Sequence, residues 1–124
     1  MKKVIATTAA PGAIGPYSQA IDTGTFVYAS GQIPLNPATG EIPEGITAQT
    51  EQSLKNVQAI LTEAGLSVDN VVKTTVFLAD MGDFAAMNEV YGRVFTEPYP
   101  ARSAVAVRTL PKNVLVEIEV IAVR

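Results

Sequence analysis

One arginine stands among small residues near the carboxyl end of this 124-residue chain. Arg102 lies in the run Pro-Ala-Arg-Ser-Ala, and on a strand its side of the chain continues through Ala104 and Ala106. A long cation above two alanines leaves room for a ligand, and its planar donor fork matches a carboxylate with two hydrogen bonds. Arg102 is therefore a candidate for holding a carboxylate, although a surface arginine in an ion pair gives the same pattern.

Two glutamates stand close together in a stretch that is otherwise rich in apolar residues. Glu117 and Glu119 lie two positions apart, so a strand would place them on one face. Neighbouring carboxylates repel, and burial raises a carboxyl pKa unless a cation faces it. A glutamate with a raised pKa could act as a base toward water. The alternative is that both face solvent or pair with Lys73 and Arg108.

Four further residues are weaker candidates for a binding site. Asn88 falls on the apolar side of a predicted helix, where a buried amide must find a hydrogen bond, either to a loop or to a ligand. Tyr17 follows Gly-Pro in a loop and could close over a pocket or simply pack. Ser30 and Gly31 end a predicted strand, and a glycine there lets the backbone approach a ligand closely. Ser30 has no neighbouring base in the sequence, which argues against a nucleophilic serine.

The composition excludes several kinds of chemistry. The chain has no His and no Cys, which removes the usual general base, the thiolate nucleophile and the commonest metal ligands. No phosphate-binding or dinucleotide motif and no metal-ligand spacing is present, so we expect no metal and no cofactor. Acidic residues outnumber basic ones by 12 to 9, which argues against nucleic acid as a partner.

The termini and apolar runs indicate a soluble protein. No apolar stretch approaches the roughly 18 residues of a membrane span. The apolar run that follows Lys2 and Lys3 breaks at Thr7 and Thr8, before it reaches the length of a signal-peptide core. We therefore expect a cytoplasmic location and no membrane partner.

The hydrophobic pattern predicts a single α+β domain over residues 1–124. Apolar residues at spacings of three and four predict two helices, 47–64 and 83–95. Thr47 is the expected N-cap of the first helix, and Gly65 is the expected left-handed residue at its end. Alternating and β-branched segments predict strands over 4–7, 18–22, 26–31, 71–79, 102–107 and 115–123.

The two helices can cover only one face of such a sheet. In the last predicted strand the even positions are apolar, whereas the odd positions mix two glutamates with apolar residues. Strand 71–79 repeats this pattern, with Val72, Val76 and Leu78 expected on the buried face. A sheet face that mixes large apolar side chains with charges suits a subunit interface better than water. The pattern therefore predicts a homo-oligomer.

Six segments in order cover nearly the whole chain and carry a resemblance to a known family. They are AIGPYSQA (13–20), ASGQIPL (29–35), VKTTVFL (72–78), FAAMNEVY (84–91), PARSAV (100–105) and LPKNVLVEIEVIAV (110–123). The chain resembles the reactive-intermediate deaminase A family, also called RidA or YjgF. The most specific matches are Ser-Gly-Gln-Ile-Pro and Pro-Ala-Arg-Ser.

The resemblance implies a fold, an assembly and a reaction. The fold would be a chorismate-mutase-like mixed β-sheet with two helices packed on one face. Three such subunits would form a homotrimer around a central barrel, with ligand clefts between neighbours. The reaction would be the hydrolytic deamination of reactive 2-imino and 2-enamino acids, such as 2-aminoacrylate and 2-aminocrotonate, to 2-oxo acids and ammonia.

The resemblance also assigns roles by position. Arg102 matches the arginine that clamps the substrate carboxylate, and Glu117 matches the glutamate that positions the attacking water. The remaining candidates match residues that bind substrate: Tyr17 as an aromatic lining the cleft, Ser30 and Gly31 as the strand end that contacts substrate, and Asn88 as a helix residue near the cleft. Ala104 stands where many members have a cysteine, which weakens a cysteine-based mechanism only.

Other functions on the same fold remain open at this point. A non-catalytic, small-molecule-binding regulatory protein is one alternative, because a fold does not determine a function. An endoribonuclease or translation inhibitor is another, since some relatives carry that label. A chaperone-like role is a third. The presence of both Arg102 and Glu117 favours the enzyme, and the acidic net charge argues against the ribonuclease.

Overall fold

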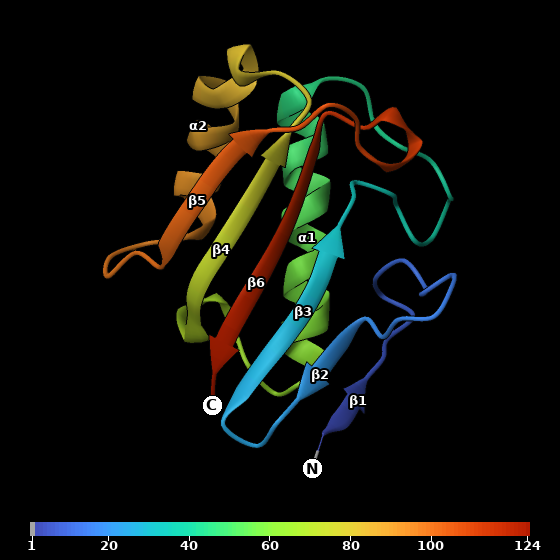
Figure 1. The fold of residues 1–124 in the computed structure, drawn as a ribbon, viewed down its shortest axis with the longest axis vertical. Helices are drawn as coiled ribbons and strands as arrows, with labels where there is room; N and C mark the ends of the chain where they lie inside the picture. Colours follow the sequence, from blue (N-terminus) through green and yellow to red (C-terminus); the bar gives the residue numbers. More distant parts are fainter. Residues whose placement is uncertain (1) are drawn as a thin grey trace.

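Six strands form a single mixed sheet in the computed structural model, which describes residues 2–124 (Figure 1). The sheet order is β1-β2-β3-β6-β4-β5, and only β4 and β5 run parallel. The predicted α+β class is confirmed. The strands are β1 (Lys3–Ile5), β2 (Ala20–Asp22), β3 (Phe26–Gln32), β4 (Val71–Leu78), β5 (Ala101–Ala106) and β6 (Val116–Val123).

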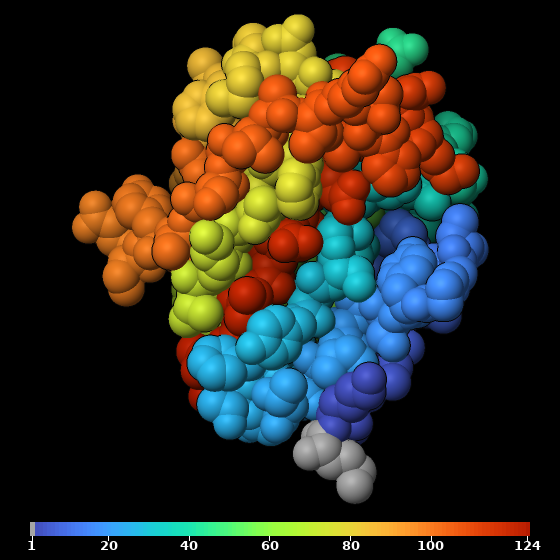
Figure 2. Space-filling model, viewed as in Figure 1, coloured from blue at the N-terminus to red at the C-terminus, as the bar shows by residue number. Residues whose placement is uncertain are grey.

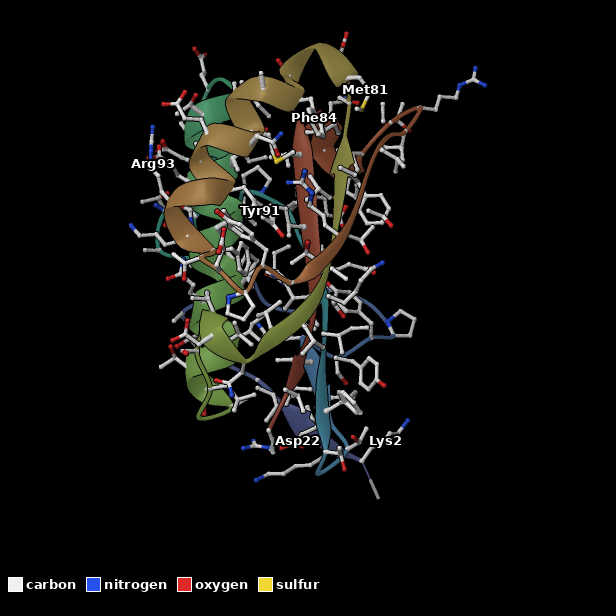
Figure 3. The ribbon with its side chains drawn as sticks, turned by 90° about the vertical axis from the view of Figure 1, so that its left-hand side faces the viewer. Lys2, Asp22, Met81, Phe84, Tyr91 and Arg93 are labelled. Atoms are coloured by element: carbon white, nitrogen blue, oxygen red, sulfur yellow. The ribbon has the colours of Figure 1, made fainter. Side chains whose placement is uncertain are left out.

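Two α-helices cover one face of the sheet, behind the strands in Figure 1 and beside them in Figure 3. Helix α1 (Ile46–Glu63) packs against β6 and β3, and helix α2 (Phe84–Val94) packs beside α1. Their buried side chains recur at the spacing of a helical face, which is why apolar periodicity predicted both helices. In α1 these are Leu54, Val57, Ile60 and Leu61; in α2 they are Met87, Val90 and Tyr91. Short 3₁₀ turns occupy Val68–Asn70, Met81–Asp83 and Pro111–Asn113.

The predicted C-terminal end of α1 is confirmed, whereas its predicted N-cap is not. Gly65 has a φ of 76°, and the Leu66 N–H donates to the Leu61 carbonyl at 2.8 Å, so the predicted left-handed end is confirmed. The predicted cap at Thr47 is wrong. Gly45, with a φ of 88°, precedes the first helical residue, and no side chain caps the start.

A β-bulge in β4 corrects the expectation for Val72. The pairing with β6 shifts register between Val71 and Lys73, so one extra residue sits on β4. Val71 therefore faces the core, and Val72 is 41% exposed. Downstream of the bulge the alternation resumes, and Val76 and Leu78 are buried as predicted.

The other face of the sheet carries no helix, and its strands lie at the surface in Figure 2. It presents Tyr28 and Val105, each nearly half exposed, beside the half-buried Phe77 and Ile121 and the exposed Glu119. The predicted mixture of large apolar and charged side chains is confirmed. Among the residues described, no helix is both long and apolar enough to cross a membrane.

The last residue ties three elements together. The Arg124 guanidinium pairs with Asp22 of β2, with nitrogen–oxygen distances of 2.8 and 2.9 Å. The same group donates to the Ala64 carbonyl at the end of α1, at 2.6 Å. The hydrogen bond from Arg124 and the one from the Gly24 N–H lower the pKa of the Asp22 carboxyl.

Candidate active site

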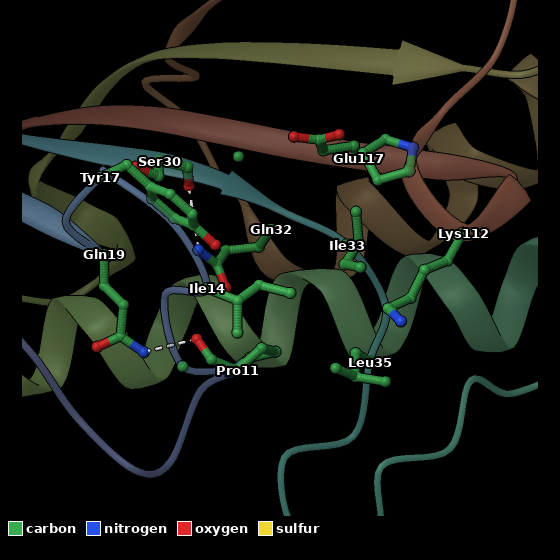
Figure 4. Close-up of a pocket in the computed structure, with 13 residues that line it drawn as sticks. Pro11, Ile14, Tyr17, Gln19, Ser30, Gln32, Ile33, Leu35, Lys112 and Glu117 are labelled. Atoms are coloured by element: carbon green, nitrogen blue, oxygen red, sulfur yellow. Dashed lines mark hydrogen bonds between the residues drawn. The ribbon is translucent and has the colours of Figure 1, made fainter.

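A cavity of about 640 Å³ opens beside the carboxyl end of β3 (Figure 4). Its volume is typical of a small-molecule site. Four of the six predicted site residues line it: Tyr17, Ser30, Gly31 and Glu117. The rest of the lining is largely apolar, from Pro11, Ile14, Ile33, Leu35 and Pro111, with polar groups from Gln19, Gln32 and Lys112.

A second β-bulge shapes this cavity. The pairing of β3 with β6 shifts between Ala29 and Gln32, so β3 carries one extra residue there. The strand predicted to end at Gly31 therefore continues to Gln32. A side chain at position 31 would overlap Glu117 Oε2 and would stand 2.8 Å from Glu117 Cδ. Only glycine lets the carboxylate lie across β3 at this point.

The Glu117 carboxylate faces the cavity and is half-buried (Figure 4). Within residues 2–124, no hydrogen bond or ion pair reaches it. Lys73, one of the two cations that could have paired with it, donates instead to Ser103 at 3.4 Å. Burial, and to a lesser extent the neighbouring Glu119, raise the pKa of Glu117. A raised pKa makes this carboxylate a stronger base toward water.

The buried side-chain amide of Gln19 anchors the loop that carries Tyr17. Gln19 accepts the Thr7 N–H at 2.7 Å and donates to the Thr7, Ala10 and Pro11 carbonyls at 3.0, 3.3 and 2.7 Å. The Ser30 hydroxyl donates to the Ser18 carbonyl at 2.6 Å and joins the loop to β3. Tyr17 thus stands at the cavity rim on an anchored loop, half exposed.

Sequence reasoning missed the polar lining from Gln19, Gln32 and Lys112. The first two are only 5% exposed, and the available signal was a polar residue inside an apolar strand pattern. Lys112 has a φ of 55°, inside a Pro-Lys-Asn turn. That turn places it at the cavity, and nothing in its local sequence points to a site 80 residues earlier in the chain.

Arg102 and Asn88 lie in a different place. Arg102 Nη1 donates to Asn88 Oδ1 at 2.7 Å, and its guanidinium lies over the rings of Tyr91 and Phe84, 4.7 and 5.5 Å from their centroids. Both aromatic residues extend from α2 toward the sheet (Figure 3). Arg102, Asn88 and Tyr91 border a cavity of about 370 Å³, which is also lined by Tyr99 and Pro100.

The sheet register explains why the two groups are separate. Arg102 pairs with Thr74 of β4, whose buried side chain faces the helices. Glu117 pairs with Phe77, which has the opposite parity and faces away from the helices. A single chain therefore does not bring Arg102 and Glu117 together.

A mixed sheet with helices on one face, a largely apolar cavity and a carboxylate without a partner among residues 2–124 are typical of an α+β protein that binds a small molecule. The family model described as Endoribonuclease L-PSP matches residues 7–124. The 2-iminobutanoate/2-iminopropanoate deaminase of Escherichia coli (strain K12) is 56% identical over 127 residues, covering 100% of this chain and 99% of that protein. A RutC family protein of Pasteurella multocida (strain Pm70) is 58% identical over 128 residues, with the same coverage.

Solved structures agree with these matches. The crystal structure of E. coli TdcF with bound serine superposes with a TM-score of 0.95 at 55% identity, covering 98% of both chains. The chain belongs to this family of reactive-intermediate deaminases and their relatives, as its sequence motifs predicted.

Proposed function

We propose that this protein is an enzyme that hydrolyses reactive 2-imino and 2-enamino acids, such as 2-aminoacrylate and 2-aminocrotonate, to 2-oxo acids and ammonia. The observation that carries the proposal is Glu117, a half-buried carboxylate without a partner among residues 2–124, held across Gly31 and facing a cavity. The name of the E. coli relative at 56% identity supports the same reaction.

The proposed site is completed by a second copy of the chain. Arg102 and Glu117 lie on opposite faces of the sheet, so a shared substrate requires two subunits. The face without helices presents Tyr28, Phe77 and Ile121, which suit burial against another copy. The loop that carries Tyr99 projects beyond the sheet edge near Arg102, at the left in Figure 2. A homotrimer around a central barrel, with Arg102 of one subunit facing the Glu117 cavity of the next, satisfies these constraints.

In this site the substrate carboxylate pairs with Arg102, whose donor fork fits it with two hydrogen bonds. Tyr17 covers the substrate, and the backbone of Ser30 and Gly31 lies against it. Asn88 stands beside Arg102 at the carboxylate end. An iminium carbon is already electrophilic, so the water needs little activation. Holding the water and the substrate in a reactive orientation therefore contributes a large part of the rate.

The chemical step uses one water molecule. Its oxygen bonds to the imine carbon, and Glu117 accepts the water proton as the carbon–oxygen bond forms. The proton then passes to the nitrogen of the tetrahedral adduct. As the carbon–nitrogen bond breaks and ammonia leaves, the hydroxyl group of the adduct gives its proton back to the Glu117 carboxylate and becomes the carbonyl of the 2-oxo acid. That proton then leaves with ammonia as ammonium, which restores the carboxylate. These reaction steps need no imidazole and no thiol, which agrees with a chain that has no His and no Cys.

A coupled assay tests the proposal. A pyridoxal-phosphate-dependent dehydratase generates 2-aminoacrylate from serine or 2-aminocrotonate from threonine, and 2-oxo acid release is followed with and without this protein. We expect a clear acceleration. If the protein binds 2-oxobutanoate but does not accelerate release, it is the non-catalytic binder instead. Cleavage of RNA without any effect on imines would favour the ribonuclease.

A further inference from the structure

The arginine proposed to hold the substrate carboxylate is itself held on three sides. Tyr91 and Phe84 stack against its guanidinium from α2, and Asn88 accepts a hydrogen bond from Nη1 at 2.7 Å. An arginine side chain otherwise has many rotamers, and ordering it on binding costs free energy. A prearranged guanidinium avoids that cost when a carboxylate arrives.

The Asn88 partner is an amide and not a carboxylate. Within residues 2–124, no acidic oxygen lies within 4.0 Å of the Arg102 guanidinium. The amide therefore fixes one nitrogen while leaving the positive charge uncompensated. An aspartate has nearly the same shape, but it would form an ion pair there and compete with a substrate carboxylate.

Tyr91 is fixed in turn by the sheet. Its hydroxyl hydrogen-bonds with the Thr74 hydroxyl at 2.8 Å, and Thr74 is the residue that pairs with Arg102 across β4 and β5. Burial raises the pKa of Tyr91, so the phenol stays neutral beneath the cation. The ring is thereby fixed between α2, which carries it, and β4, the strand next to the one that carries Arg102.

We propose that Asn88 and Tyr91 are positioning residues for Arg102, which fix its guanidinium and keep its charge available to a substrate carboxylate. This inference rests on the proposed carboxylate clamp. It changes the role of Asn88 from a residue that binds substrate to one that acts through Arg102.

The test compares Asn88→Asp, Asn88→Ala and wild type in the intact protein, by calorimetric binding of 2-oxobutanoate and by thermal unfolding. We expect Asn88→Asp to weaken binding by about tenfold or more without lowering Tm, because it adds an ion pair that neutralises Arg102. Asn88→Ala should weaken binding less, since it loosens the guanidinium but leaves it charged. In the imine assay, both changes should raise KM more than they lower kcat.

Two further variants separate positioning from general stability. Tyr91→Phe keeps the ring but loses the hydrogen bond to Thr74, so it should weaken binding less than Tyr91→Leu, which removes the ring and should lose roughly 5- to 30-fold in affinity. Glu89→Gln, on the exposed side of the same helix, is the control and should change nothing. Wild-type affinity in Asn88→Asp, or an affinity loss that simply follows Tm in every variant, would overturn the proposal.

A measurement on Arg102 itself does not depend on imine chemistry. The ¹⁵N resonances of its guanidinium, assigned with Arg102→Lys, report rotation about the Cζ–Nε bond. We expect slow rotation in wild type and faster rotation in Asn88→Ala and Tyr91→Leu. Slow rotation in a protein that neither hydrolyses imines nor binds 2-oxobutanoate would reject the proposed function and keep the positioning role. Fast rotation in wild type would reject the positioning role whatever the activity.

Discussion

Glu117 combines the two properties that a general base toward water needs. It is buried enough for its pKa to rise, and it opens onto a cavity where a water and a substrate can stand. No cation among the described residues neutralises it. In the proposed mechanism this uncompensated carboxylate is the base, and its burial lowers folding stability.

Replacing this carboxylate tests both consequences. Glu117→Gln should reduce kcat by about 10²- to 10⁴-fold, the usual contribution of general-base catalysis. Because burial raises the pKa of Glu117 in the folded state, its charged form disfavours folding, and this penalty grows as pH rises through that pKa. The variant should therefore unfold at the same temperature or higher at pH 7. A fall in Tm, or retained kcat, would contradict this role.

The matched control is the neighbouring glutamate on the same strand. Glu119 is exposed, and its charge contributes to the raised pKa of Glu117. In wild type, kcat/KM should fall as pH drops below the pKa of Glu117, because the base becomes protonated. Glu119→Gln should keep activity and move this acidic limb to lower pH. An unchanged or upward-shifted limb would contradict the assignment.

Gly31 acts through the space it leaves. Gly31→Ala places a methyl group where the Glu117 carboxylate lies, so the side chain must swing away. We expect a large loss of kcat with a small change in Tm, since the displaced atoms are the end of a flexible side chain. In a Glu117→Gln background the same change should cost little more, because the two residues act as one unit. Additive losses would show that Gly31 works in another way.

At the scale of elements, the strongly periodic segments could be predicted from the sequence, and the irregular ones could not. Both helices and all six strands appear close to their expected ranges. The errors occur at Thr47, Val72 and Gly31. At Thr47 no side chain caps the helix start. Val72 and Gly31 lie at or beside bulges, where one inserted residue reverses which face of the sheet the following side chains point to. Bulges depend on pairing between distant strands, which local patterns do not contain.

The ion pair of Arg124 joins β2, the end of α1 and the end of β6, so it should matter for cohesion between elements. The lowered pKa of Asp22 means that its contribution to stability is full above the ordinary aspartate pKa and is lost as pH falls through the lowered value. Asp22→Asn should lower the urea midpoint at pH 7 and reduce its loss on acidification. Equal midpoints for the two proteins at pH 7 would contradict this contribution.

At the scale of the whole molecule, the sequence proposed six site residues, and the structure places them in two separate groups. The family resemblance assigned Arg102 and Glu117 to one site. In a single chain they lie on opposite faces of the sheet, because they pair with residues of β4 that face opposite sides. The mixed sheet face that predicted an oligomer is present. The cytoplasmic location stays a prediction. The trimer and the individual residue roles also stay predictions, since a single chain holds only half of the proposed site.

Mixing two inactive variants tests the shared site. If each site takes Glu117 from one subunit and Arg102 from the next, neither Arg102→Ala nor Glu117→Gln alone should hydrolyse 2-aminocrotonate at a significant rate. In trimers reassembled from equal amounts of both, about one quarter of the sites receive both native residues. We expect the mixture to regain about one quarter of wild-type activity. No recovery in confirmed mixed oligomers, with an active wild type, would contradict a site built between subunits.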